Sequence, residues 1–151
     1  MQLTVNNAIV KYNLLNCVKY SDEGYSLLRE LKIKIIRLKL NLEKIYKDFN
    51  QFQQKAIEEV KTPRYKELLK KENRTEEETK EAEKLLEEMN QDLRNILTQK
   101  SQEIVDVNFE YFSEEEYNSF LETNINNSVE INGVKIPAEE YVILFHNEFV
   151  Q

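Results

Sequence analysis

Few side chains in this 151-residue chain could carry out nucleophilic, acid–base or metal chemistry. His146 is the only histidine and Cys17 the only cysteine, so a catalytic or metal-binding cluster built on either residue type has at most one member. Glu148 follows His146 by two positions, whereas two ligands on one helix face are three or four positions apart. We therefore expect no metal site and no cofactor.

Three consecutive carboxylates, Glu114, Glu115 and Glu116, could in principle supply an acid and a base. Ser113 precedes them, and Ser113 followed by Glu116 is the capping-box pattern that starts a helix. A capping role explains these residues without catalysis, and we keep them as a candidate partner-binding surface.

Glycine is scarce, because Gly24 and Gly133 are the only two in the chain. Loops that cradle phosphate groups use glycine to bring the backbone close to the ligand. Glycine-rich nucleotide-binding loops are therefore excluded, and we expect that the chain is not an enzyme.

Charge is distributed unevenly around a net value of −7. Residues 1–102 hold 20 basic and 17 acidic side chains, whereas residues 103–151 hold 11 acidic side chains and one basic side chain. The acidic third disfavours nucleic acid and suits either a basic protein surface or a solvated exterior. The longest strongly apolar run, residues 141–145, is too short for a membrane span, and the first residues lack a secretion signal pattern, so neither membrane insertion nor secretion is expected.

The strongest pattern is a heptad of apolar residues in a predicted helix over residues 24–61. Its members are Leu28, Leu31, Ile35, Leu38, Leu42, Ile45, Phe49, Phe52 and Ala56. A second helix is predicted over residues 75–103, and pairing residues whose numbers sum to 138, such as Phe52 with Leu86, aligns the two stripes. The sequence therefore predicts an antiparallel helical hairpin over residues 24–103, with its tip near residues 62–75.

Three apolar residues of the first helix, Ile33, Ile36 and Leu40, lie off this seam. They need another neighbour, which could be the amino-terminal helix, the sheet or a second copy of the chain. Lys32, Lys34 and Lys39 lie at the edges of the seam, and such edge charges select the partner, so we expect acidic residues opposite them. In the predicted register Lys32 and Lys34 reach past the second helix, toward the acidic third.

The predicted tip is basic and contains one aromatic residue, Tyr65, close to Lys70 and Lys71. Such a patch could contact phosphate, but Glu67 and Glu72 dilute its charge, so nucleic acid is disfavoured. We treat Tyr65, Lys70 and Lys71 as candidate protein-docking residues.

The rest of the chain predicts an α+β module made of residues 1–20 and 104–151. A first strand near residues 3–5 precedes a helix that runs to about residue 20. Alternating polarity at 105–111 predicts a strand, Asn132 and Gly133 predict a hairpin turn, and a helix or a competing strand follows Pro137. We expect a single domain, residues 1–151, in which one small sheet carries the projecting hairpin.

Three segments follow one another along the chain, with the long charged helix between the first and the second: LTVNNAIVKYNLLN, EEEYNSFLE and SVEINGVKI. This order of segments resembles that of small uncharacterised proteins of tailed bacteriophages, which form a domain family of unknown function. The resemblance implies a phage source and a role in assembly or in an interaction directed at the host. It implies no activity and no functional residues.

Together these features predict a non-enzymatic protein–protein interaction or assembly protein, a small virion structural component. The alternative is an acidic phage-encoded inhibitor that imitates a phosphate array and binds a basic host enzyme. The expected partners are virion subunits or a basic host protein, with a homo-oligomer left open, and the expected location is the virion or the host cytoplasm.

Overall fold

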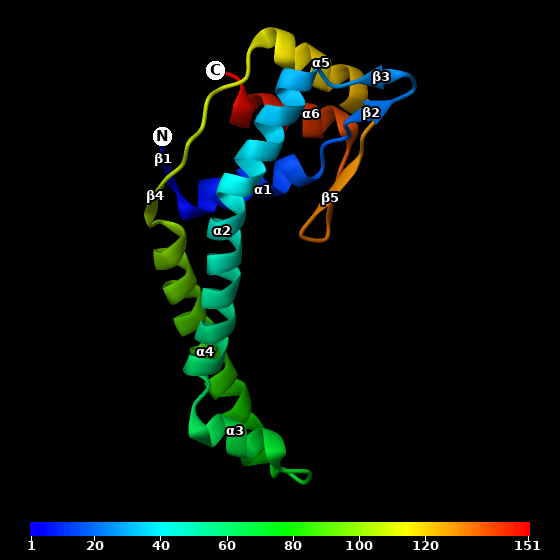
Figure 1. The fold of residues 1–151 in the computed structure, drawn as a ribbon. Coiled ribbons are helices and arrows are strands. Elements are labelled where there is room, and N and C mark those ends of the chain that lie inside the picture. Colours follow the sequence, from blue (N-terminus) through cyan, green and yellow to red (C-terminus); the bar gives the residue numbers. More distant parts are fainter. The chain divides into compact units, whose positions relative to one another are not determined.

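A computed structural model describes all 151 residues, and its fold is mostly helical with small antiparallel sheets. In chain order (Figure 1) the elements are β1 (Gln2–Thr4), α1 (Val5–Asn16), β2 (Ser21–Asp22), β3 (Tyr25–Ser26), α2 (Arg29–Val60), α3 (Pro63–Lys70), α4 (Glu76–Ser101), β4 (Ile104–Asp106), α5 (Glu114–Asn124), β5 (Val129–Ile131), β6 (Val134–Ile136) and α6 (Ala138–Phe149). The predicted α+β class is confirmed. No helix combines the length and the apolar composition that crossing a membrane requires.

The chain forms two compact units, and the division between them falls inside α2. Unit 1 consists of Met1–Tyr46 and Ile104–Gln151, and unit 2 consists of Lys47–Glu103. The first part of α2 therefore belongs with the two ends of the chain, and its second part belongs with α3 and α4.

The core of unit 1 joins the inner face of α2 to the aromatic residues of α5 and α6. Leu31, Ile35 and Leu42 of α2 are fully buried in the same cluster as Phe120 and Phe145. The rings of Phe120 and Phe145 stack with their centres 3.8 Å apart. Burying each such side chain contributes about 1.5–3 kcal/mol. Of the first half of the heptad, Leu31, Ile35 and Leu38 thus pack into the protein's own core, whereas Leu28 is 39% exposed.

The strands form three separate two-stranded sheets, so the expectation of one small sheet is wrong. β1 pairs with β4, β2 with β3, and β5 with β6, all antiparallel. The strand predicted at residues 105–111 is paired with β1 only as far as Asp106, although Val107 and Phe109 still point into the core. At Phe112 a single parallel bridge to Val150 replaces strand pairing. Alternating polarity therefore identified Val107 and Phe109 as buried, but it failed at Tyr111, which is 40% exposed, and it did not identify the partner strands.

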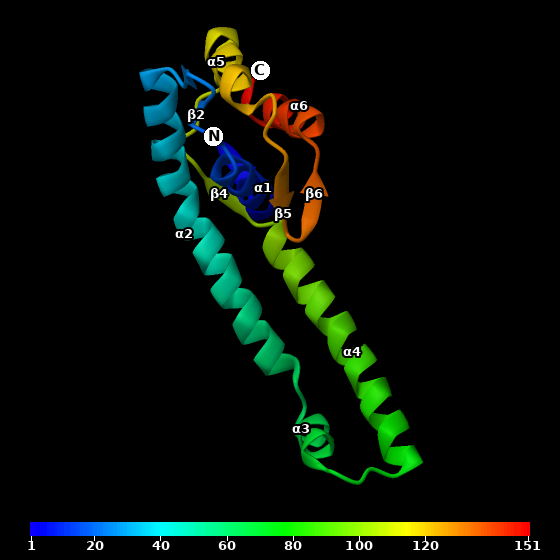
Figure 2. The same ribbon diagram turned by 90° about the vertical axis from the view of Figure 1, so that its right-hand side faces the viewer.

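Two tight hairpins in unit 1 depend on backbone with positive φ. In the β5–β6 ribbon (Figure 2), Asn132 and Gly133 have φ values of 52° and 78°. Both central residues of a type I′ turn require positive φ, which asparagine and glycine adopt at low cost. The β2–β3 hairpin has the same arrangement at Glu23 and Gly24, in a stretch where the sequence predicted only the end of a helix. α1 ends at Asn16, short of the predicted residue 20.

The helix predicted to follow Pro137 is confirmed as α6, and the competing strand is wrong. Pro137 precedes the first helical residue, where its missing N–H removes no helical hydrogen bond. The capping box at Ser113 and Glu116 is likewise confirmed, and it starts α5.

Unit 2 contains a helix, α3, that the sequence analysis did not predict. Thr62 caps α3 by accepting a hydrogen bond from the backbone N–H of Tyr65, and Pro63 is its first residue. Tyr65 and Leu68 of α3 pack in one cluster with Ala82 and Met89 of α4. The residues that cover this part of α4 therefore come from the predicted tip.

The predicted register of the helical hairpin is wrong. Lys100 Nζ lies 5.2 Å from the centre of the Phe52 ring, although the prediction paired Phe52 with Leu86. Positions 86 and 100 are about 21 Å apart along an α-helix, too far for one lysine side chain to bridge. Leu86 is instead 41% exposed. Phe52 thus lies near the carboxyl end of α4 and not beside Leu86.

A buried polar network in unit 1 fixes the segment that follows α1 against α5. Asn124 is fully buried, and its side chain accepts a hydrogen bond from the backbone N–H of Lys19 at 2.9 Å and donates one to the Lys19 carbonyl at 3.1 Å. Asn127 Nδ2 donates to Asn124 Oδ1 and to the Cys17 carbonyl. The Tyr141 hydroxyl donates to the Leu14 carbonyl at 2.7 Å, and burial raises the pKa of this phenol. The network satisfies backbone groups that the end of α1 would otherwise leave unpaired.

Replacing Asn124 by alanine should lower the free energy of unfolding by about 2–3 kcal/mol, because several buried polar groups lose their partners at once. Urea denaturation followed by circular dichroism measures this change. Asn126→Ala is the matched control, since Asn126 is exposed and makes no side-chain hydrogen bond, and its effect should stay within about 0.5 kcal/mol. Equal effects of the two substitutions would contradict the role of the network.

Candidate protein-docking surface

The outer face of α2 in unit 1 carries an exposed apolar stripe, formed by Ile33, Ile36 and Leu40. Their steps of three and four place them on one face of the helix, away from the buried Leu31 and Ile35. The three side chains are 37%, 46% and 63% exposed. Neither the amino-terminal helix nor a sheet of the same chain covers them, so this segment of α2 is apolar on two faces.

Basic side chains border the exposed stripe. Arg29 lies on its line, Lys32 and Lys39 lie along one edge, and Arg37 lies along the other. None of these four side chains makes a hydrogen bond or an ion pair within the chain. Such unpaired charge beside exposed apolar surface is typical of a contact region that is completed by another molecule.

Two hollows flank the exposed stripe within unit 1. One, of about 290 Å³, is lined by Ile36 and Leu40 with Tyr12 of α1 at its far side. The other, of about 500 Å³, is lined by Ile33 and Arg37 of α2, and its opposite wall is the extended segment that contains Phe109. A ridge of side chains between two grooves is the relief that packs against a second helix.

Lys34 is the one edge lysine that finds an acidic partner in the chain, as its predicted reach toward the acidic third suggested. Its Nζ lies 3.1 Å from Glu116 Oε1 and donates to the Tyr111 carbonyl at 3.1 Å. Glu116 also completes the capping box through the backbone N–H of Ser113. Of the three predicted acidic docking residues, Glu116 is therefore occupied within the fold.

The other two acidic residues are open to solvent at the start of α5. Glu115 is exposed, and the Glu114 side chain is 72% exposed with its Oε1 3.8 Å from His146 Nε2. No group of three or more histidine, cysteine, aspartate or glutamate side chains is close enough together to hold a metal ion. The start of α5 offers surface charge rather than a constructed site.

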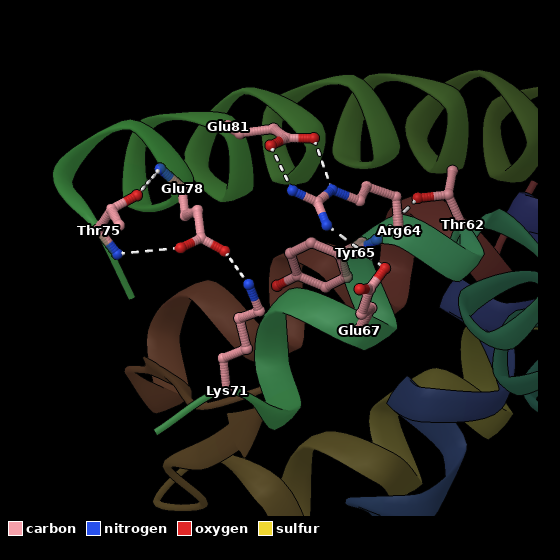
Figure 3. Close-up of polar contacts among 8 residues, drawn as sticks. All are labelled: Thr62, Arg64, Tyr65, Glu67, Lys71, Thr75, Glu78 and Glu81. Atoms are coloured by element: carbon pink, nitrogen blue, oxygen red, sulfur yellow. Dashed lines mark hydrogen bonds and ion pairs between the residues drawn. The ribbon is translucent and has the colours of Figure 1, made fainter. Parts of the chain in front are cut away.

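Ion pairs within unit 2 involve two of the basic side chains of the tip, Arg64 and Lys71 (Figure 3). Arg64 makes a two-pronged contact with Glu81, with nitrogen–oxygen distances of 2.8 and 3.0 Å, and Lys71 donates to Glu78. These hydrogen bonds lower the pKa of Glu81 and lower the pKa of Glu78 to about 2. Thr75 adds a capping box on Glu78. The ion pairs remove only part of the positive charge of the tip, because three other basic side chains there are exposed and make no ion pair: Lys66, Lys70 and Arg74.

The predicted tip residues have different environments. Tyr65 is only 9% exposed because its ring packs against α4, so it offers little surface for docking. Lys71 is paired with Glu78, whereas Lys70 is exposed and has no partner. The sequence could not reveal the Arg64–Glu81 pair, because 17 residues separate its members.

Comparison of the chain with models of known protein families, with curated proteins and with solved structures finds no match. The possible roles of the surfaces described above are therefore argued from their residues alone.

The carboxyl of Glu78 should titrate near pH 2, well below its ordinary value of 4.5, because Lys71 and the Thr75 backbone donate to it. Because the folded protein lowers the pKa of Glu78, the ionised carboxylate stabilises the fold at pH values above 4.5. This stabilisation is lost as the pH falls from 4.5 toward 2. NMR titration of the side-chain carboxyl measures the midpoint, and Lys71→Ala should raise it toward 4.5.

Lys70→Ala is the matched control for this titration, since Lys70 is adjacent in sequence and makes no ion pair. It should leave the midpoint unchanged. A Glu78 midpoint that responds equally to both substitutions would contradict a specific Lys71–Glu78 contact.

Proposed function

We propose that this chain is a non-enzymatic assembly protein, a small structural component of a bacteriophage virion, that docks on neighbouring subunits through the exposed stripe. The observation that carries the proposal is the two-faced segment of α2. Leu31 and Ile35 are fully buried on one face, while Leu40 is 63% exposed on the other. An exposed apolar ridge bordered by unpaired charge supports protein docking more than it supports any chemistry.

We propose the phage source and the virion location from the order of three segments in the sequence, LTVNNAIVKYNLLN, EEEYNSFLE and SVEINGVKI. No residue contact enters that part of the proposal. In unit 2 we further infer that the second part of α2 and α4 form the two arms of a coiled-coil-like helical hairpin. The heptad spacing and the position of Lys100 over the Phe52 ring support this arrangement.

Inhibition of a basic host enzyme remains a second candidate function. Glu114, Glu115, Glu139 and Glu140 are exposed at the starts of α5 and α6, and they favour a basic surface. Glu116 is paired with Lys34, so it does not add a free negative charge to this group, and the resemblance to a row of phosphates is weaker.

Mass spectrometry of purified particles should detect the wild-type chain, and Leu40→Glu should reduce its incorporation at least tenfold, because a buried unpaired carboxylate would face the partner. Ile143→Glu is the matched control: Ile143 is 59% exposed on α6, outside the exposed stripe, and should be incorporated normally. Absence of the wild-type chain from particles would contradict the virion role and favour the second function.

A further inference from the structure

The unpaired charges of α2 indicate what covers the exposed stripe. Residues 29–44 hold six basic and two acidic side chains, in a chain whose net charge is −7. Four of the six, Arg29, Lys32, Arg37 and Lys39, have no partner in the structure, and they border the apolar residues. One acidic side chain, Glu30, also lies at this border, but the basic residues outnumber it, so two such faces would repel each other and an acidic occupant is favoured.

The first half of α4 has the complementary character. Residues 76–92 hold eight acidic and two basic side chains. Three of the acidic residues pair within unit 2, and the other five make no ion pair: Glu77, Glu83, Glu87, Glu88 and Asp92. Glu83 and Glu87 lie beside Leu86, which is 41% exposed. This acidic face of α4, formed by Glu83, Leu86 and Glu87, combines an apolar contact with two unpaired carboxylates.

We propose that the exposed stripe of one copy packs on the acidic face of α4 in a second copy of the chain. Leu86 would cover part of the ridge formed by Ile36 and Leu40. Glu83 and Glu87 would meet the basic residues at the edges of the stripe. Helices pair in this way when apolar side chains interdigitate and edge charges are opposite in sign.

The charge pattern also explains why the contact uses a different helix from each copy. Packing α2 on α2 would place basic residues opposite each other, and packing α4 on α4 would do the same with acidic residues. Of these three pairings, only α2 on α4 brings opposite charges together. A contact of a few helical turns lies at the small end of protein interfaces, which predicts weak, salt-sensitive association. The inference rests on the proposed function in one respect, namely that the exposed stripe is a docking surface.

Size-exclusion chromatography with light scattering on the full chain tests the pairing. At low ionic strength the mass should rise with concentration to at least twice 18.1 kDa, and in about 0.5 M NaCl it should fall toward 18.1 kDa. The double variant Lys32→Glu, Arg37→Glu should stay monomeric, and so should the double variant Glu83→Lys, Glu87→Lys. Mixing the two variants should restore association, because each then offers the other opposite charges at both contacts.

Lys135→Glu, a reversal on the exposed surface of β6, is the matched control and should associate as the wild type does. A wild-type chain that remains at 18.1 kDa would overturn the inference, as would association that survives either double reversal or a mixture that stays monomeric. If the chain is monomeric but its incorporation into particles still depends on Leu40, the pairing with a second copy is wrong and the docking role in the virion holds. If the chain self-associates but is absent from particles, the pairing holds and the virion role is wrong.

Discussion

Burial of the inner face of α2 against the aromatic residues of α5 and α6 is the contact on which unit 1 depends. Leu31 and Ile35 have no exposed surface, and the stacked rings of Phe120 and Phe145 belong to the same core. A helix held by one face presents its opposite face in a fixed orientation. The exposed stripe is therefore displayed on a rigid element, so this chain loses little conformational entropy when a partner binds.

The two basic surfaces of the protein differ in what lies beside their unpaired charges. At the tip of unit 2, Arg64 and Lys71 are paired with glutamates of α4, and the aromatic residue of the tip, Tyr65, is buried. On α2 in unit 1, the unpaired side chain of Arg37 lies beside an exposed apolar residue, Ile33. Residue counts alone make both regions look basic, but only α2 combines unpaired charge with exposed apolar surface. This difference favours α2 over the tip as the candidate docking surface.

Local signals in the sequence were sufficient for several elements. Ser113 and Glu116 start α5, and the absence of glycine and proline between residues 29 and 60 permits the long α2. Placing Ile33, Ile36 and Leu40 off the heptad also anticipated that the inner face of α2 would leave them uncovered.

The failures of sequence reasoning are both local and non-local. The predicted helix over residues 24–61 ends before Thr62 and Pro63, whereas a threonine cap followed by proline also begins a helix, and this local ambiguity conceals α3. A heptad pattern shows which face of a helix is apolar but not which residue of the second helix that face meets, so it did not reveal the error in register. The free guanidinium of Arg37 and the burial of Tyr65 depend on what other segments bring to them, which no spacing along the chain encodes.

Hydroxyl-radical footprinting of the full chain at low and high protein concentration tests most directly whether the outer face of α2 is a docking surface for a second copy. Leu40 should be labelled strongly in dilute protein and protected in concentrated protein, while Ile143, which is similarly exposed, should be labelled equally in both. Labelling of Leu40 that does not change with concentration, in protein that light scattering shows to be self-associated, would place the contact elsewhere and contradict this assignment.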